Sequence, residues 1–464
     1  MGLGMRLGIS LTSGAKSFRK PRPDLSRMIA FQVLTEVNEH DAYANLLLPK
    51  VLSETVLEKR DKGFITELVY GTLRMQGRHD WILSQVSDRA WDEVDAGISN
   101  VARLGVHQLF EMRVPTHAAV SATVELARKV LGESKATYVN ELLRKVSAKS
   151  FDEWMQDLHS QASQSEDKLG LFAIKYSHPE WIVSAYFDLL RADSEVELAL
   201  ASNNVAASPT LVAWPGRSCQ ADLVNLGGVP TQYSHYGATA VDIPSEIDLI
   251  RSRKAGVQDE GSQLVASIFA KAAVGNSKWL DLCAGPGGKA ALLSGLARQV
   301  GSEFTANEVS EPRAKLVEQV VDGDRVLVDD GRFLANRGER FGAVLADVPC
   351  TGVGALRRRP EIRWRRQPSD LPGLTLLQRE LFDSAVKLTE IGGIFGYATC
   401  SPHLAETKVQ VSSGLKRNQN IRQMDVTPFL PSNLVKATVN GSLQLWTHRH
   451  GTDAMFLTLF ERVS

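Results

Sequence analysis

The 464-residue sequence has few cysteines, no long apolar run and no excess of either charge. Four cysteines in so long a chain do not make a disulfide framework, which favours a reducing, cytoplasmic location. No apolar run approaches the roughly 18 residues of a membrane span, so we expect no membrane contact. Lys plus Arg and Asp plus Glu are equal at 53 each. Any binding of nucleic acid must therefore come from local clusters of charge.

The usual phosphate-binding motifs are also missing from the glycine-rich stretch Trp279–Leu293, WLDLCAGPGGKAALL. Its glycines do not follow G-x-G-x-x-G, and Ala290 after Lys289 excludes a P-loop. The stretch still predicts a strand, a sharp turn and a helix that offers free backbone N–H groups. Such turns hold nucleotide-like ligands in open α/β sheets. A nucleoside without a pyrophosphate fits this turn better, and S-adenosylmethionine is the common one.

Changes in hydrophobic pattern divide the chain into four parts. Residues 1–22 are expected to form a disordered basic tail, and residues 23–165 an all-helical domain whose first helix Ser26 can cap. That domain could be a scaffold or could dock RNA. Residues 166–254 are expected to form a linker with a small α+β segment. Residues 255–464 alternate short apolar runs with helical runs, which predicts a doubly wound parallel sheet.

Acidic residues follow several strands of the predicted sheet, at the edge where ligands bind. Glu308 ends the strand after the glycine turn and suits the two ribose hydroxyls, although a helix-capping carboxylate is the alternative. Asp330 ends the next strand and could accept from an adenine amino group; the adjacent Asp329 leaves that choice open. Asp347 ends the fourth strand.

Two cysteines, Cys350 and Cys400, are expected at the mouths of neighbouring strands. Buried free cysteines are commonly inert. A metal site would need three or four ligands, and no C-x-x-C or paired-histidine spacing accompanies them. The third interpretation is a nucleophilic thiolate, favoured by a nearby cation such as Lys289. Thiolate attack at C6 of cytosine activates C5 for methylation, and Asp347 could stabilise the charge that moves into the ring.

An arginine-rich segment follows Cys350 directly, and we call residues 351–366 the arginine loop. Six arginines and one glutamate give it a local charge of +5. Arginine with an interleaved tryptophan suits phosphate contact and base stacking, whereas most charge clusters are solvated surface. We expect RNA contacts at Arg357, Arg358, Arg359, Arg363, Trp364 and Arg365.

With these residues identified, the chain resembles the bacterial ribosomal RNA cytosine-C5 methyltransferases of the RsmB (Sun/Fmu) type. The family motifs are matched by Asp281–Lys289, by Asp347-Val-Pro-Cys350 and by Thr399-Cys400-Ser401. VQDEGSQL and GTDAMF are also similar. The helical domain resembles NusB-type RNA-binding domains through AYANLLL, ELVYGTLR and YVNELLRKV. The resemblance covers nearly the whole chain.

The resemblance implies a multidomain chain: an all-α NusB-like domain, a small α+β connecting segment and a Rossmann-like S-adenosylmethionine-dependent methyltransferase domain. It makes Cys400 the C6 nucleophile and Cys350 the residue that assists product release. The implied cofactor contacts are Cys283, Ala284, Gly285, Pro286, Gly287, Gly288, Lys289, Glu308, Asp330 and Asp347. Two departures, Gly285 for a common alanine and Ala290 for Thr or Ser, remove no group to which we assign a role.

The expected activity is formation of 5-methylcytosine in 16S ribosomal RNA by a monomer that needs no metal. One alternative is a transfer RNA cytosine-C5 methyltransferase. Another is a non-catalytic RNA-binding or antitermination factor, which the paired cysteines argue against because a pure binder has no use for both.

Overall fold

The computed structural model describes residues 24–240 and 243–464 of the chain. The tail predicted for residues 1–22 lies outside the described residues. Within the described residues no helix is long and apolar enough to cross a membrane.

The N-terminal region is helical, as predicted. Its helices are α1 (Leu25–Glu39), α2 (Ala44–Glu54), α3 (Lys59–Arg74), α4 (Gln76–Ser84), α5 (Ala96–Phe110), α6 (Thr116–Leu131), α7 (Glu133–Val146) and α8 (Phe151–Ser165). Their apolar faces meet in one core. Asp24 rather than Ser26 caps α1, because the Asp24 carboxylate accepts the backbone N–H of Arg27 at 2.8 Å while Ser26 is buried inside the helix.

The connecting segment divides into two structurally different parts. Three further helices come first: α9 (Lys168–Tyr176), α10 (Glu180–Leu190) and α11 (Asp193–Ser202). They share a core with Val353, Leu356 and Ile362 of the arginine loop. A small antiparallel sheet follows, in the order β2-β1-β3. Its elements are β1 (Thr210–Ala213), α12 (Gln220–Asn225), β2 (Gly237–Thr239), α13 (Asp248–Arg251) and β3 (Ala255–Val257).

The C-terminal region is built on a nine-stranded sheet in the order β10-β11-β12-β8-β7-β4-β5-β6, with β9 paired to β12. Five strands are parallel, as predicted: β4 (Lys278–Asp281), β5 (Glu303–Asn307), β6 (Arg325–Leu327), β7 (Phe341–Asp347) and β8 (Thr389–Thr399). The antiparallel additions are β9 (Ile421–Met424), β10 (Thr438–Val439), β11 (Ser442–Gln444) and β12 (Phe456–Arg462). From β4 the chain continues to β5 and β6 on one side and then crosses to β7 on the other side of β4. This reversal of strand order opens a crevice between β4 and β7.

Helices cover both faces of this sheet. They are α14 (Glu260–Ala272), α15 (Gly288–Gln299), α16 (Glu311–Glu318), α18 (Asp370–Leu388) and α19 (Lys408–Arg417). The short helices α17 (Ile362–Arg365) and α20 (Thr447–His450) lie towards α9, α10 and α11 instead. Residues of α14, α15 and α16 pack in one core, and residues of α18 and α19 pack in another. Short 3-10 turns are η1 (Trp91–Glu93), η2 (Pro244–Glu246), η3 (Leu334–Arg337), η4 (Leu404–Glu406), η5 (Thr427–Phe429) and η6 (Ser432–Ala437).

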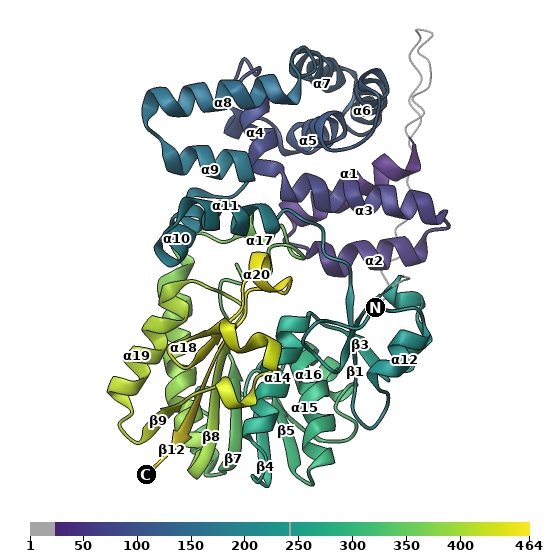
Figure 1. Cartoon of the computed structure of the whole chain (residues 1–464). Helices are drawn as coiled ribbons and strands as arrows, with labels where there is room; N and C mark the ends of the chain where they lie inside the picture. The colour runs from purple at the N-terminus through teal and green to yellow at the C-terminus, as the bar shows by residue number, and fades with distance from the viewer. Residues whose placement is uncertain (1–23, 241–242) are drawn as a thin grey trace.

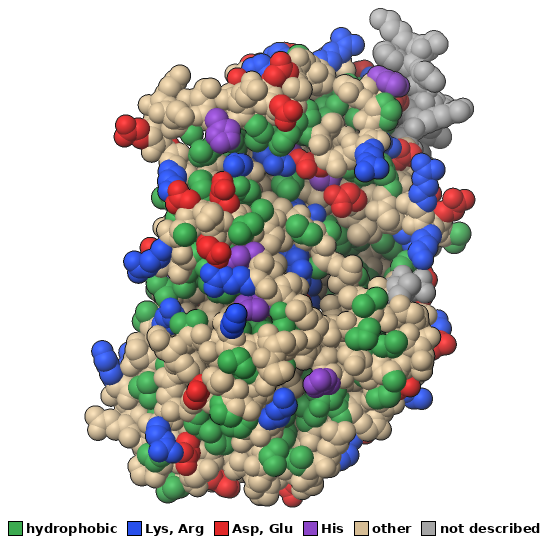
Figure 2. All heavy atoms as spheres, viewed as in Figure 1, with side chains coloured by type: hydrophobic (Ala, Val, Ile, Leu, Met, Phe, Trp, Pro, Cys, Tyr) green, Lys and Arg blue, Asp and Glu red, His purple; other side chains and the backbone are tan. Residues whose placement is uncertain are grey.

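The helical region stacks above the large sheet, with α10, α11 and α17 between them (Figure 1). On the face shown in Figure 2, Lys and Arg side chains are interspersed with Asp and Glu rather than gathered in one basic surface. The fold class is the predicted one: a helical region, a small antiparallel sheet and a doubly wound α/β sheet.

Candidate active site

The glycine turn forms a tight cradle between β4 and α15. Gly287 precedes α15 with a φ of +108°, which favours glycine. The backbone N–H of Gly285 donates to Glu308 Oε2 at 3.0 Å. A Cβ at Gly285 would lie 2.3 Å from that same oxygen, so a larger residue would displace the carboxylate. Glycine at this position therefore allows Glu308 to approach the turn.

Glu308 follows β5 and its side chain is only 5% exposed. Besides the Gly285 contact, its Oε1 accepts the backbone N–H of Ser310 at 2.9 Å and lies 2.6 Å from the Arg313 guanidinium. A buried carboxylate held in this way presents oxygens of fixed direction to the cradle. Both oxygens already have partners within the chain, and the ribose role of Glu308 remains a prediction.

The two aspartates after β6 each have their own arginine. Asp330 accepts from the Arg332 side chain, and this hydrogen bond lowers the pKa of Asp330 against the effect of burial. Asp329 accepts from the Arg337 side chain at 2.7 Å. Both carboxylates are thus paired with arginine side chains, and Asp330 remains a prediction for the adenine contact.

Lys289 and Asp347 meet in the crevice between β4 and β7. Lys289 Nζ donates to Asp347 Oδ2 at 2.7 Å. Burial alone would lower the pKa of Lys289, but the Asp347 carboxylate outweighs burial and raises that pKa. The lysine is therefore a fixed positive charge at the floor of the site.

The two cysteines lie in contact, as expected for residues after neighbouring parallel strands. Cys350 comes three residues after β7 and Cys400 directly follows β8. Their Sγ atoms are 3.3 Å apart. The hydrogen bond with Cys350 lowers the pKa of Cys400, and Lys289 adds to this effect. The same hydrogen bond, together with burial, raises the pKa of Cys350. The pair therefore favours a thiolate on Cys400 and a thiol on Cys350.

Comparison with known proteins places this site in a family. A family model described as 16S rRNA methyltransferase RsmB/F matches residues 269–461, and a NusB family model matches residues 24–148. A putative methyltransferase of Mycobacterium tuberculosis is 41% identical over 461 residues, which cover 98% of this chain and 100% of the relative. Ribosomal RNA small subunit methyltransferase B of Pseudomonas putida is 30% identical, over 86% of this chain and 91% of its own length. The chain belongs to the RsmB/F family.

This RsmB/F family member is an S-adenosylmethionine-dependent RNA methyltransferase with a NusB-type helical domain. The crystal structure of PH0851 aligns with a TM-score of 0.76 over 94% of this chain and 97% of that chain. At 22% identity, that likeness shows a shared fold that includes the helical region.

The arginine loop makes contacts that differ from the predicted RNA surface. Arg363 is 0% exposed, and its guanidinium donates to the backbone oxygens of Arg74, Ser177 and Asn203 and to the Asn204 side chain. These oxygens lie at the C-terminal ends of α3, α9 and α11, which carry partial negative charge. The predicted RNA contact at Arg363 is wrong, because no part of its side chain reaches the surface.

Trp364 and Arg365 extend the same joint. The Trp364 indole donates to the Leu73 carbonyl at 2.7 Å, and its ring packs on Gly77, where a Cβ would come within 2.5 Å. Arg365 donates to the carbonyl of Val37 at 2.8 Å, near the end of α1. We call α17 and these helix ends the α17 joint. In this RsmB/F enzyme it fastens the segment after Cys350 to the helical region.

The first three arginines of the loop also contact other residues of the protein. Arg357 donates to the Gly451 carbonyl at 2.6 Å. Arg358 forms an ion pair with buried Asp453, and the Arg359 guanidinium lies 5.0 Å from the centre of the Tyr43 ring. RNA contact at these three arginines remains a prediction.

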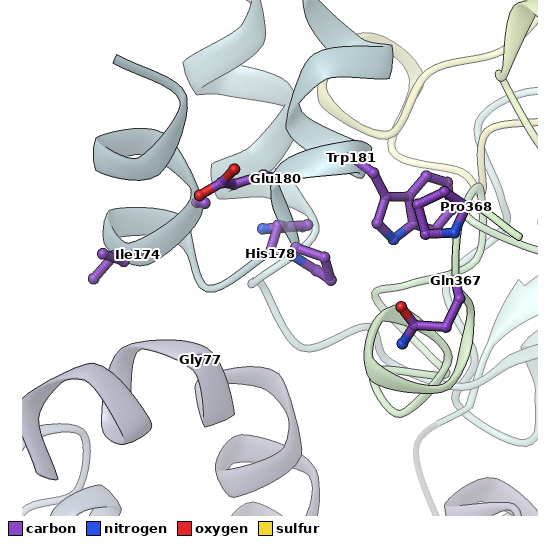
Figure 3. A pocket seen from close by; sticks show the side chains of 9 residues that line it. Gly77, Ile174, His178, Glu180, Trp181, Gln367 and Pro368 are labelled. Atoms are coloured by element: carbon purple, nitrogen blue, oxygen red, sulfur yellow. The ribbon is translucent and has the colours of Figure 1, made fainter. Parts of the chain in front are cut away.

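A cavity of about 480 Å³ borders the α17 joint (Figure 3). Residues of α4, of α9 and α10 with the turn between them, and of the segment after α17 line it: Gly77, Ala173, Ile174, His178, Pro179, Glu180, Trp181, Gln367 and Pro368. The Trp181 ring lies 6.5 Å from the His403 ring, three residues after Cys400. The cavity therefore lies between the helical region and the segment after α17, and its Trp181 also reaches the segment after Cys400.

Sequence reasoning gave no role to three buried carboxylates near the cysteines. Asp281 ends β4, and burial and the neighbouring Asp347 raise its pKa to about 7. Burial raises the pKa of Asp453 to about 6 despite its ion pair with Arg358. Glu406 is 0% exposed and lies in η4. Asp281 and Asp453 lie within family motifs identified in the sequence, and this position could have pointed to them. Glu406 lies in none of these motifs.

Proposed function

We propose that this methyltransferase forms 5-methylcytosine in 16S ribosomal RNA, with Cys400 as the nucleophile. The observation that carries the proposal is the contact between the two cysteine sulfurs at 3.3 Å, beside Lys289 and Asp347. A cytosine-C5 methyltransferase needs one thiolate to attack and a second group to help it leave, and the pair supplies both.

The proposed methylation uses the charged groups around the two cysteine sulfurs. The Cys400 thiolate forms a bond to C6 of cytosine, and the displaced electron pair makes C5 nucleophilic. Asp347 and Lys289 stabilise the charge that develops in the ring. S-adenosylmethionine supplies the methyl group that C5 takes up. The C5 proton then leaves to water, the C5–C6 double bond re-forms and the C6–S bond breaks. The Cys350 thiol stabilises the departing Cys400 thiolate by a hydrogen bond.

The cradle fits a nucleoside cofactor without a phosphate. It combines the free N–H groups at the start of α15 with the buried Glu308 carboxylate. We propose that the cofactor contacts Cys283, Ala284, Gly285, Pro286, Gly287, Gly288, Lys289, Glu308, Asp330 and Asp347.

Replacing Glu308 with glutamine should weaken cofactor binding by about 10- to 100-fold. The change keeps the side-chain shape but removes a charged acceptor, and a hydrogen bond to a charged group contributes about 1.5–3 kcal/mol. Titration calorimetry with S-adenosylhomocysteine measures the affinity. Glu311→Gln is the matched control, because Glu311 is exposed on α16, outside the cradle, and forms an ion pair with Lys315. Equal affinity in Glu308→Gln and wild type would argue against the ribose role.

The substrate is tested by bisulfite sequencing of ribosomal and transfer RNA from cells with and without the protein. We expect one or more cytosines of 16S ribosomal RNA to lose their resistance to bisulfite when the protein is removed. Loss confined to transfer RNA would replace the proposed substrate. Unchanged resistance in both RNAs would contradict cytosine-C5 methylation.

We further propose that the NusB-type domain and the segment after it position the RNA, and that the protein acts as a monomer.

A further inference from the structure

Glu406 is a fully buried carboxylate six residues after Cys400. None of the ion pairs within residues 24–240 and 243–464 includes it. Its charge is instead held by three hydrogen bonds. Oε1 accepts the backbone N–H of Thr351 at 2.8 Å and the Gln378 amide at 3.0 Å, and Oε2 accepts the Thr351 hydroxyl at 2.5 Å. Burying a carboxylate without an ion-pair partner is costly, and these hydrogen bonds offset that cost. The His403 imidazole is a further titratable group on which Glu406 acts.

The hydrogen bonds of Glu406 hold the turn that carries Cys350. Thr351 is the next residue after Cys350, and it is bound through both its backbone and its hydroxyl. The Gln378 amide that donates to Glu406 also donates to the Pro349 carbonyl at 2.9 Å. Thr351 is therefore held by the carboxylate directly, and Pro349 is held through Gln378. The Tyr397 hydroxyl in turn donates to the Glu406 carbonyl at 2.9 Å, which fixes the carboxylate's own backbone.

The charges around the two sulfurs are unequal. Cys350 faces Glu406, Asp347 and Cys400, and Glu406 contributes to raising the pKa of Cys350. Cys400 faces Lys289, which lowers its pKa, as well as Asp347 and Asp453, which raise it. Asp347 acts on both sulfurs and cannot distinguish them. The hydrogen bond between the two sulfurs has the largest effect on both pKa values. Beyond it, the charged groups that differ are Lys289, Asp453 and Arg358 near Cys400 and Glu406 near Cys350.

We propose that Glu406 is a positioning residue that fixes the Cys350 turn and keeps Cys350 as a thiol, so that the thiolate forms on Cys400. The inference rests on the proposed function, in which Cys400 attacks the base. It adds the reason why two sulfurs in contact take different roles: a buried negative charge disfavours a second one on Cys350.

Alkylation by iodoacetamide tests this assignment without RNA. A thiolate displaces iodide and forms a thioether, so the initial rate at each cysteine, measured by peptide mass spectrometry over a pH series, reports its ionisation. We expect wild-type protein to react first at Cys400. In Glu406→Gln the rate at Cys350 should rise about tenfold at fixed pH, the effect expected when one nearby charge is removed. Methylation by the variant should lose kcat with little change in KM for RNA.

Two further variants make the outcome decisive. Glu390→Gln is the matched control, because Glu390 is exposed near the start of β8, at the other end of the strand from Cys400. Thr351→Val removes the hydroxyl that binds Oε2, loosens the hold of Glu406 on the Cys350 turn and should shift alkylation towards Cys350 in the same direction. This variant carries the test if Glu406→Gln does not fold. Unchanged alkylation at Cys350 in a folded variant overturns the inference. Absence of RNA methylation in wild type overturns the proposed function and leaves the alkylation result intact.

Discussion

Replacing Cys350 with alanine is expected to leave the protein covalently attached to its RNA. Cys400 keeps its thiolate-favouring neighbour Lys289, so it still attacks C6 of cytosine. The 3.3 Å contact that stabilises the departing sulfur is lost, and breakage of the C6–S bond becomes slow. With RNA and S-adenosylmethionine present, a denaturing gel should show a protein–RNA adduct that wild type does not accumulate.

The companion change, Cys400→Ala, should give no adduct and should lower the methylation rate by at least about 1,000-fold, as loss of a covalent nucleophile does in other enzymes. Cys219→Ala is the control, because Cys219 is an exposed thiol outside the site. An adduct in Cys400→Ala and none in Cys350→Ala would mean that the two roles are exchanged. No adduct in either variant, together with normal methylation, would remove covalent catalysis from the proposal.

The centre of the site could be predicted because parallel strands bring distant residues to one edge. Cys350 and Cys400 are 50 residues apart in the chain, yet each follows a strand of the same pair, β7 and β8. The glycine turn and Glu308 follow from the same rule, since β4 and β5 are also neighbours. Such positions need only the strand order and the strand ends, and both leave clear patterns in a sequence.

The contacts of the arginine loop could not be predicted from its composition. A local charge of +5 suits phosphate, but a guanidinium is equally well bound by carbonyl oxygens at the C-terminal ends of helices. Those oxygens belong to the backbone, so no acidic residue in α3, α9 or α11 marks the partner of Arg363. Glu406 escaped notice for a related reason. Its significance depends on three donors that only the folded chain assembles around it.

Loss of the Arg363 guanidinium should therefore weaken the connection between the helical region and the sheet rather than RNA binding alone. Burial, together with the nearby Arg74, lowers the pKa of Arg363 to about 9, so the side chain is still charged near neutral pH. Arg363→Ala leaves the oxygens of Arg74, Ser177 and Asn203 without their donor in a buried place. A buried acceptor left without its donor costs about 1–3 kcal/mol. Denaturant unfolding measures the loss in free energy of unfolding. Hydrogen exchange at the ends of α3, α9 and α11 shows where the structure is weakened.

A rise in hydrogen exchange confined to one region would distinguish this prediction from a general loss of stability. Exchange should rise at the α17 joint and in the arginine loop, while binding of S-adenosylhomocysteine is kept, because the cradle between β4 and α15 makes no contact with Arg363. Arg366→Ala is the matched control, since Arg366 is the neighbouring half-exposed arginine and only approaches Asp370, at 3.7 Å. Arg363→Lys should recover little, because an ammonium cannot reach acceptors on three helices at once. If Arg363→Ala and Arg366→Ala unfolded at the same denaturant concentration with equal exchange, α17 would not be a joint. The Cys350 segment would then be held by Glu406 and by the contacts of Arg358, Trp364 and Arg365 without a contribution from Arg363.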